Sequence, residues 1–297
     1  MIEPSLTRVF VRDLCLFAHH GVLPEETRLG QRFFISMDVA ADIDLAITGD
    51  DYTQAVCYSQ LCSIASDVSR HANFQLIETL ADRIAQAVLE YYSQVVEVRI
   101  EIRKPSAPLP YTVREVAVEV TKKRVESIGL SLGANIGERE ATLKAALETL
   151  ARTEGVQLDR VSSLYDSAPW GIEDQPSFVN LCLLARTSLN PLALLRLCKE
   201  TECLLGRAPG RHWGERALDI DVLFYGQKEV KTPVLTLPHP HLFERAFVLE
   251  PLYELDPTLS LSGRTIKDAL ARLPRKEGDA VRRGQTPFWY LEDLYVS

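Results

Sequence analysis

The sequence predicts an α+β protein of two unrelated domains, and three observations support this. The chain has 297 residues, 46% of them hydrophobic, which is enough for two buried cores in domains of about 120 to 170 residues. Strand-like and helix-like patterns occur in both halves, but in different orders. The first pattern stops at Lys122, Lys123 and Arg124, and a new strand begins almost at once. We therefore expect domains at residues 1–124 and 125–297 with hardly any linker.

In the first half, the residue patterns predict a sheet with two helices. Thr7 to Asp13 and Gln31 to Ile47 are rich in β-branched and aromatic side chains, which favour strands, and the polar segment Gly21 to Gly30 predicts a loop. Helical spacing follows, and then the period returns to two. The further elements expected are helices at Ser59 to His71 and Ile77 to Tyr92, and strands at Val96 to Ile102 and Val116 to Val120.

In the second half, strands and helices alternate in a β-α-β-β-α-β order. This order is typical of a ferredoxin-like α/β sandwich, with helices packed on a sheet. The expected strands are Ser127 to Leu132, Val161 to Ser167, Val179 to Thr187 and Ala217 to Tyr225, and the expected helices are Arg139 to Thr153 and Pro191 to Leu205.

Composition narrows the classes of function. The net charge is -8, from 33 basic and 41 acidic residues, which argues against nucleic acid as the main partner. The start of the chain lacks a basic region followed by an apolar run, and no stretch approaches the roughly 18 apolar residues of a membrane span. The six cysteines form no CxxC pair, so we expect reduced thiols. A soluble cytoplasmic protein without a membrane partner is expected.

Four residues of the first half form a recognisable constellation. They are Glu26 in HGVLPEETRLGQRF, Tyr58 in AVCYSQL, Glu78 in LIETLADRIA and Lys104 in IEIRKPSAPLP. Taken singly, Glu78 offsets a helix dipole and Lys104 is a solvated charge at a strand end. Their joint spacing resembles the dihydroneopterin aldolase family over about residues 5 to 122.

The resemblance implies a retro-aldol site for a pterin. Glu78, next to Ile77 in the substrate pocket, would accept the two-donor edge of the pterin in a bidentate pair. Lys104 would act as general acid and base, Tyr58 would help move the proton of the side-chain hydroxyl, and Glu26 would order a water near the lysine. No cofactor is implied, because the ring imine is the electron sink.

The same resemblance has implications for fold and assembly. The family has a tunnelling fold (T-fold), in which antiparallel sheets of several subunits close into a ring and leave no open edges. The tyrosine arrives from a neighbouring subunit. We therefore expect a homo-oligomer, a tetramer or an octamer, formed through the first domain.

The strongest local signal is the segment RAPGRHWGERALDIDVLFY in the second half. Asp219 and Asp221 flank Ile220 on an apolar strand, so a period of two sends both carboxylates to one face. Two adjacent carboxylates repel one another, and magnesium carried by a nucleotide triphosphate would relieve this repulsion. Arg207, Arg211 and Arg216 precede the pair and can bind phosphate. No Walker A sequence is present, which argues against a P-loop ATPase.

These features resemble the hydroxymethyl-dihydropterin pyrophosphokinases over about residues 127 to 275. The matching pieces are SLGANIG, VSSLYDSAPWG, EDQPSFVN, WGERALDIDVLFY and LPHPHLFERAFVLEPL. The family transfers a diphosphoryl group from ATP to the hydroxymethyl oxygen of a pterin. Asp219 and Asp221 would hold two Mg²⁺ ions, while Arg207 and Arg216 would neutralise charge on the transferred group.

The resemblance also assigns the two substrate pockets. Phe178 and Phe247 would sandwich the pterin, and Asn180 would pair with its amide edge. The nucleotide pocket would be formed by Glu202, Arg211, Trp213, His239 and Arg245. The sequence departs from the family at His212, where an arginine commonly precedes the tryptophan, and the arginine loop is about one residue short.

Two alternatives remain open at this point. The first half permits an epimerase of dihydroneopterin or its triphosphate, because the same lysine chemistry can re-add glycolaldehyde. The second half would need exposed aromatic residues and a basic surface to be an RNA-binding module, and its prominent strand carries two aspartates instead. The paired-enzyme reading is supported by chemistry, since the product expected from the first half is the acceptor expected in the second.

Overall fold

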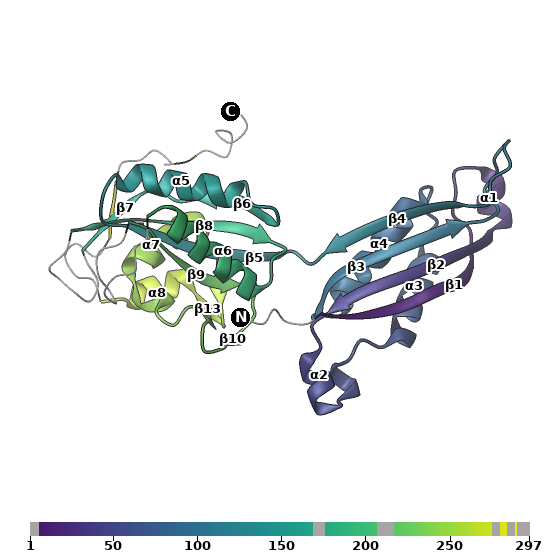
Figure 1. Cartoon of the computed structure of the whole chain (residues 1–297), viewed down its shortest axis with the longest axis horizontal. Coiled ribbons are helices and arrows are strands. Elements are labelled where there is room, and N and C mark those ends of the chain that lie inside the picture. Colours follow the sequence, from purple (N-terminus) through teal and green to yellow (C-terminus); the bar gives the residue numbers. More distant parts are fainter. Residues whose placement is uncertain (1–5, 169–175, 207–216, 275–279, 284–288, 290–297) are drawn as a thin grey trace. The chain divides into compact units, whose positions relative to one another are not determined.

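The computed structural model describes residues 6–168, 176–206, 217–274, 280–283 and 289 (Figure 1). The chain divides into two compact units, Met1–Arg124 and Val125–Ser297. Each unit combines a β-sheet with helices and has its own buried core, so the protein is of the mixed α/β type.

The first unit is built on a four-stranded antiparallel sheet in the order β1-β2-β3-β4. Its strands are β1 (Thr7–Ala18), β2 (Gln31–Ala41), β3 (Val95–Lys104) and β4 (Val116–Lys123). Alternation is clear in the second half of β3, because Val98, Ile100 and Ile102 are buried while Arg99 between them is exposed. A strand with this pattern has one face in the core and one face in water.

Two long helices, α3 (Tyr58–His71) and α4 (Ile77–Tyr91), cover one face of this sheet (Figure 1). Both are amphipathic, and the apolar residues of α4 recur three or four positions apart at Leu80, Ile84 and Val88. These side chains pack on the buried face of β2 and β3. The sheet and helices together fix the ends of β3 and α4, where candidate site residues lie.

The structure corrects two expectations in this unit. The strand expected to reach Ile47 ends at Ala41, and the short helix α2 (Asp44–Gly49) and the 3-10 helix η1 (Tyr52–Gln54) follow. Asp50, in a left-handed conformation, donates its N–H to Ala46 and Ile47 and ends α2. The segment expected to be a loop contains α1 (Pro24–Leu29), which begins with a proline, a residue suited to a first helical turn.

The second unit contains an antiparallel sheet in the order β14-β7-β8-β5-β9, with β6 also paired to β8. Its strands are β5 (Glu126–Ala134), β6 (Val156–Val161), β7 (Tyr165–Ser167), β8 (Phe178–Thr187), β9 (Asp219–Tyr225) and β14 (Val281–Arg282). Within the strand expected from Val161 to Ser167, only Val161, the last residue of β6, and the three residues of β7 are strand; most of β6 precedes the expected range. The central strands β5 and β8 are buried along most of their length.

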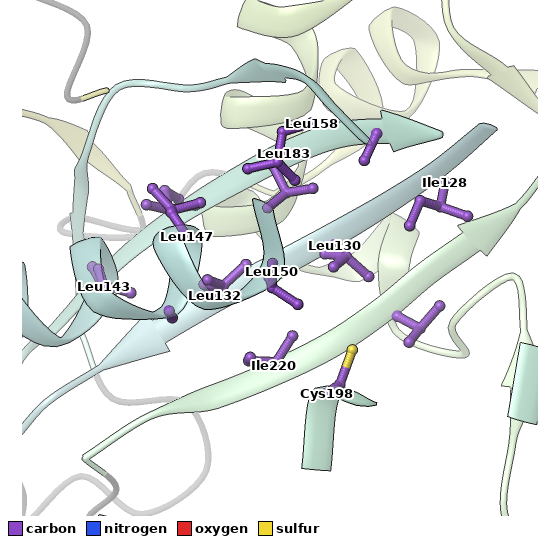
Figure 2. Close-up of a cluster of buried hydrophobic side chains, with 14 of the residues drawn as sticks. Ile128, Leu130, Leu132, Leu143, Leu147, Leu150, Leu158, Leu183, Cys198 and Ile220 are labelled. Carbon is purple, nitrogen blue, oxygen red and sulfur yellow. The ribbon is translucent and has the colours of Figure 1, made fainter. Parts of the chain in front are cut away.

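Helices cover both faces of this sheet. Figure 2 shows Leu143, Leu147 and Leu150 of α5 (Arg139–Ala151) gathered with side chains of β5, β8 and β9. Cys198 of α6 (Pro191–Leu204) belongs to the same cluster. A second cluster on the other face contains Leu249 of α7 (Ala246–Leu255) and residues of α8 (Ile266–Arg272). Smaller elements are β10 (Val230–Lys231), β11 (Thr236–Leu237), η2 (Leu242–Glu244), β12 (Ser260–Leu261) and β13 (Arg264–Thr265).

Candidate active sites

In the first unit, Lys104 and Glu26 form a nearly buried ion pair. Lys104 is the last residue of β3 and Glu26 lies in the first turn of α1. The lysine Nζ is 2.5 Å from Glu26 Oε1, and the two side chains are only 11% and 8% exposed. A pair so shielded from water is held much more firmly than a surface salt bridge. The fold therefore assembles an ammonium and a carboxylate at one point.

The surroundings of Glu26 favour its charged form. Its carboxylate accepts hydrogen bonds from Leu23 N at 3.1 Å and from Gln31 Nε2 at 3.0 Å. Burial opposes ionisation, but Lys104, the Leu23 amide and Gln31 together outweigh it and lower the pKa of Glu26. Gly21 has φ +147°, and a Cβ there would lie 2.3 Å from Glu26 Oε2. A glycine is required at that position for the carboxylate to approach the chain so closely.

His20 is a neighbour of this pair that sequence reasoning missed. The side chain is fully buried, its Nδ1 accepts a hydrogen bond from Phe74 N at 3.2 Å, and its Nε2 lies 3.0 Å from Ser69 Oγ. Burial, together with the charges of His19 and Lys104, lowers the pKa of His20 to about 4. The imidazole is therefore neutral at pH 7, with its proton on Nε2 directed to Ser69. The sequence signal was a histidine placed directly before Gly21.

Tyr58, Ile77 and Glu78 lie at helix starts. Tyr58 begins α3 and is 69% exposed. Ile77 and Glu78 begin α4, with Ile77 buried and Glu78 exposed. Within the described residues of a single chain, neither Tyr58 nor Glu78 forms a side-chain hydrogen bond or ion pair. The structure thus brings Glu26 and Lys104 together but does not join Tyr58 or Glu78 to them by direct contact.

In the second unit, three candidate residues share one face of the sheet. Gly133 of β5 is the cross-strand partner of both Asn180 on β8 and Asp219 on β9. Cross-strand partners point to the same face, and Asp221 joins them two residues further along β9. Gly133 contributes no side chain, and a Cβ there would lie 2.9 Å from Asn180 Oδ1. Space is thereby left between the amide and the carboxylates.

Two side chains that precede α7, one arginine and one histidine, lie at Asp221. Its Oδ2 accepts a hydrogen bond from Arg245 Nη1 at 3.1 Å, and His239 Nε2 lies 3.8 Å away. His239 Nδ1 accepts from His241 N, which leaves Nε2 to carry the proton. Burial lowers the pKa of His239, although Asp221 opposes this effect. Arg245 is therefore the permanent positive charge at this carboxylate.

The candidate pterin residues lie at the start of β8 and on α7. Asn180 is buried at 3% exposure and donates from Nδ2 to Ser167 Oγ at 2.9 Å. Phe178 begins β8, and Phe247 lies in α7 beneath the guanidinium of Arg245, which is 5.6 Å from its ring centroid. Within the described part of the chain, the rings of Phe178 and Phe247 are not in contact with one another.

Glu202 has a structural environment that the sequence did not indicate. It lies on α6, is fully buried, and its Oε1 accepts hydrogen bonds from Lys199 Nζ at 2.7 Å and from Ile220 N at 2.8 Å. Ile220 lies between Asp219 and Asp221. Glu202 therefore holds the backbone of β9 at the point from which both aspartates project.

Four predicted residues lie outside the described part of the structure. These are Arg207, Arg211, Trp213 and Arg216, and the unusual His212 lies in the same stretch. In the described residues, no group of three His, Cys, Asp or Glu side chains could hold a metal ion by protein ligands alone. In the same residues, no helix is both long and apolar enough to cross a membrane.

Comparison with protein families assigns each unit separately. Residues 9–121 match the model described as dihydroneopterin aldolase. Residues 129–257 match the model described as 7,8-dihydro-6-hydroxymethylpterin-pyrophosphokinase. The chain belongs to both families. It is a bifunctional enzyme of folate biosynthesis, with an aldolase domain followed by a pyrophosphokinase domain.

Individual proteins and solved structures are similar to parts of this chain. The 2-amino-4-hydroxy-6-hydroxymethyldihydropteridine pyrophosphokinase of Methylorubrum extorquens is 45% identical over 144 residues, which are 48% of this chain and 91% of that protein. The folic acid synthesis protein fol1 of Pneumocystis carinii is 30% identical over 263 residues, 83% of this chain but only 35% of that protein. The E. coli dihydroneopterin aldolase structure with neopterin is 24% identical, with a TM-score of 0.36, over 39% of this chain and 98% of that one.

Proposed function

We propose that the aldolase domain cleaves 7,8-dihydroneopterin into 6-hydroxymethyl-7,8-dihydropterin and glycolaldehyde. The observation that carries this proposal is the nearly buried contact between Lys104 and Glu26. Breaking the C1′–C2′ bond sends an electron pair into the ring, and N5 must then gain a proton. Lys104 delivers that proton directly or through a water, and Glu26 keeps the ammonium in position. The ring accepts the electrons, so no cofactor is required.

Glu78 and Ile77 form the pterin pocket of this proposal. The exposed carboxylate at the start of α4 accepts the 2-amino and N3 protons in a bidentate pair. Hydrogen bonds from Gly21 N to Phe74 O at 2.9 Å, and from Phe74 N to His20, tie the segment before α4 to the end of β1. These bonds support a fixed spacing between the pterin anchor and Lys104.

Tyr58 completes the site from a second copy of the chain. Its 69% exposure at the start of α3 supports a role that requires a neighbour. The neighbouring tyrosine moves the proton of the substrate hydroxyl. Both β1 and β4 are edge strands of the sheet, and pairing of such edges between subunits builds the closed ring of a T-fold. We expect a tetramer or an octamer by native mass spectrometry.

The pyrophosphokinase domain, in the same proposal, transfers a diphosphoryl group from ATP to the hydroxymethyl oxygen and releases AMP. Its strand order β6-β8-β5-β9, with α5 and α6 as the crossover helices, supports a ferredoxin-like core. Asp219 and Asp221 are partly exposed on one face. One or two carboxylates plus phosphate oxygens is the ligand set that Mg²⁺ prefers, so these residues fit two such ions. When bound, the ions neutralise phosphate charge.

The chain's own residues hold the two substrates. Arg245 and His239 lie at Asp221 and are suited to contact phosphate and ribose, and Glu202 fixes β9 for this site. Asn180 presents Oδ1 to the donor edge of the pterin, and Phe178 and Phe247 keep their predicted role of stacking on the two faces of the ring. Arg207, Arg211, Trp213 and Arg216 keep their predicted phosphate and nucleotide roles as part of the proposal.

Each half-reaction is tested by itself on the purified chain. With 7,8-dihydroneopterin alone, the proposal predicts glycolaldehyde. Accumulation of the epimer without glycolaldehyde would support the epimerase alternative and reject the aldolase reaction. With 6-hydroxymethyl-7,8-dihydropterin, ATP and magnesium, it predicts AMP and the pterin diphosphate in equal amounts. Formation of ADP instead of AMP would reject diphosphoryl transfer.

A further inference from the structure

The C-terminal segment of the chain returns to the edge of the pyrophosphokinase sheet. Strand β14 pairs with β7 antiparallel, with Val281 opposite Asp166 and Arg282 opposite Tyr165. Arg283 N extends this pairing by donating to Leu164 O at 2.8 Å. Further along, Trp289 is 5% exposed and belongs to the core beneath α5. Residues 281–283 and Trp289 are therefore part of the folded domain, although the family match ends at residue 257.

Arg283 forms a bidentate ion pair with Asp166, the middle residue of β7. Its Nε and Nη2 each bind Asp166 at 2.5 Å, one to each carboxylate oxygen, and its Nη1 binds Glu140 of α5 at 2.6 Å. A fork-shaped pair of this kind fixes direction as well as distance. Arg283 therefore joins β7 to α5 through two carboxylates.

Arg282 holds the residues at the start of β7. Its Nη2 binds Ser163 Oγ at 2.7 Å and Glu254 of α7 at 3.0 Å. Glu254 also accepts hydrogen bonds from Tyr165 Oη at 2.9 Å and from the N–H and hydroxyl of Ser163. Arg282 of β14 and Arg283, the next residue, thus tie β7 to helices α5 and α7.

The far side of β7 contacts the candidate pterin residues. Tyr165 and Ser167 are the cross-strand partners of Asn180 and Phe178. Asn180 Nδ2 donates to Ser167 Oγ at 2.9 Å and approaches Tyr165 O at 3.5 Å. A backbone carbonyl only accepts, so this geometry turns Nδ2 toward β7 and leaves Oδ1 for the substrate. The orientation of the Asn180 amide therefore depends on the position of β7.

Strand β7 has three residues, and a strand so short derives its register from its neighbours. We propose that Arg282 and Arg283 are positioning residues for the pterin pocket, acting through β7 and Ser167 on Asn180. The inference rests on the proposed pterin-binding role of Asn180. It gives the C-terminal segment a part in substrate affinity, with no contact to the reacting atoms.

The test is the steady-state kinetics of full-length Arg283→Ala, with 6-hydroxymethyl-7,8-dihydropterin varied at saturating ATP and magnesium. Loss of a bidentate charged pair that positions the amide should raise the KM for the pterin about tenfold or more. The KM for ATP and the kcat should change less than about twofold, since the side chain of Arg283 bonds Asp166 and Glu140 and none of Asp219, Asp221 or Arg245. Arg272→Ala, an exposed arginine of α8, is the matched control and should behave as the wild type.

A charge-swap double variant distinguishes loss of Asn180 positioning from a general loss of folding or activity. Asp166→Arg combined with Arg283→Asp should recover at least part of the pterin KM lost in Arg283→Ala, and release of glycolaldehyde should be unchanged in every variant. A wild-type pterin KM in Arg283→Ala would overturn the inference. Equal losses for pterin and ATP without recovery in the swap would overturn it as well. Failure of the wild type itself to form pterin diphosphate would instead reject the proposed function.

Discussion

The two candidate sites differ in how they balance charge. In the aldolase domain, Lys104 and Glu26 neutralise each other at 2.5 Å, and both side chains are nearly buried. In the pyrophosphokinase domain, Asp219 and Asp221 place like charges on one strand face, and Asp221 remains about one-third exposed beside Arg245. In the first site, the lysine and its partner carboxylate are paired before any substrate arrives. The second has carboxylates that a metal-bound phosphate can reach.

The two reactions place different electrostatic requirements on the two domains. Proton transfer needs a single group held at a fixed place, and burial with a counter-charge achieves that. Diphosphoryl transfer needs compensation of several negative charges that come with the nucleotide, so the protein keeps an open, charged surface. The comparison predicts that substitutions at the two sites have separate consequences.

The largest effect is expected for Asp219→Asn. Removing one of two carboxylates proposed to hold magnesium should lower AMP formation about 1,000-fold, since the metal contributes several kcal/mol to transition-state stabilisation. Glycolaldehyde release should be unchanged. Asp159→Asn, which alters an aspartate paired with Arg186 at the surface of the same domain, is the control. A decrease of less than about tenfold in Asp219→Asn would break the proposed metal role.

Lys104→Ala is expected to act on the other reaction alone. Loss of general acid–base catalysis should lower glycolaldehyde release about 100- to 1,000-fold. AMP formation from added 6-hydroxymethyl-7,8-dihydropterin should stay at the wild-type rate. Lys122→Ala is the control for loss of charge in the same domain. Lys122 lies on β4 and is paired with Asp82 of α4. Unchanged glycolaldehyde release in Lys104→Ala would remove the lysine from the mechanism.

Glu26→Gln tests the buried charge pair of the aldolase domain through the free energy of unfolding of that domain. It leaves Lys104 nearly buried without its counter-charge, which should cost about 3 to 5 kcal/mol at pH 7. The pKa of Glu26 is lowered from its ordinary value of 4.5, so the pair contributes fully above that value and is lost as pH falls through the lower folded pKa. Hydrogen exchange of β3 peptides in urea, measured for the wild type and for Glu26→Gln at pH 7 and at about pH 3.5, gives the difference in free energy of unfolding at each pH. An equal difference at the two pH values would contradict this account.

His20→Asn should have the smallest effect. The pKa of His20 is about 4 in the folded chain against an ordinary 6.5. Between these values the unfolded chain binds a proton that the folded chain does not, so stability falls as pH drops from 6.5 toward 4. From pH 6.5 to 5 this loss is about 1.5 kcal/mol. Asparagine keeps an acceptor for Phe74 N but cannot titrate, so hydrogen exchange in α3 should show this loss in the wild type only.

The sequence predicted the elements with strong periodicity. Strand β3 and the β9 aspartates follow from a period of two, and helix α4 follows from its apolar stripe. It missed β6 and β14, which have six and two residues. Such strands exist because a neighbouring strand pairs with them, and a single sequence does not show that partner.

For the candidate sites, the motifs predicted which residues to consider, and the contact of Lys104 with Glu26 and the shared face of the two aspartates agree with the expected grouping. The helix carrying Glu26 and the buried His20 were not predicted. Helix α1 has six residues and is stabilised by tertiary contacts rather than by propensity. The burial of Glu202 and its bond to Ile220 N also depend on packing, which no local pattern records.

We propose that one chain holds two sites: an aldolase site built on a lysine–glutamate pair, and a pyrophosphokinase site that depends on magnesium. A single assay distinguishes the two. The purified chain is given 7,8-dihydroneopterin, ATP and magnesium, and glycolaldehyde and AMP are counted with and without a chelator in excess. We predict both products with magnesium, and glycolaldehyde alone at an unchanged rate with the chelator. Loss of glycolaldehyde together with AMP, or AMP formation in the chelator, would contradict the claim.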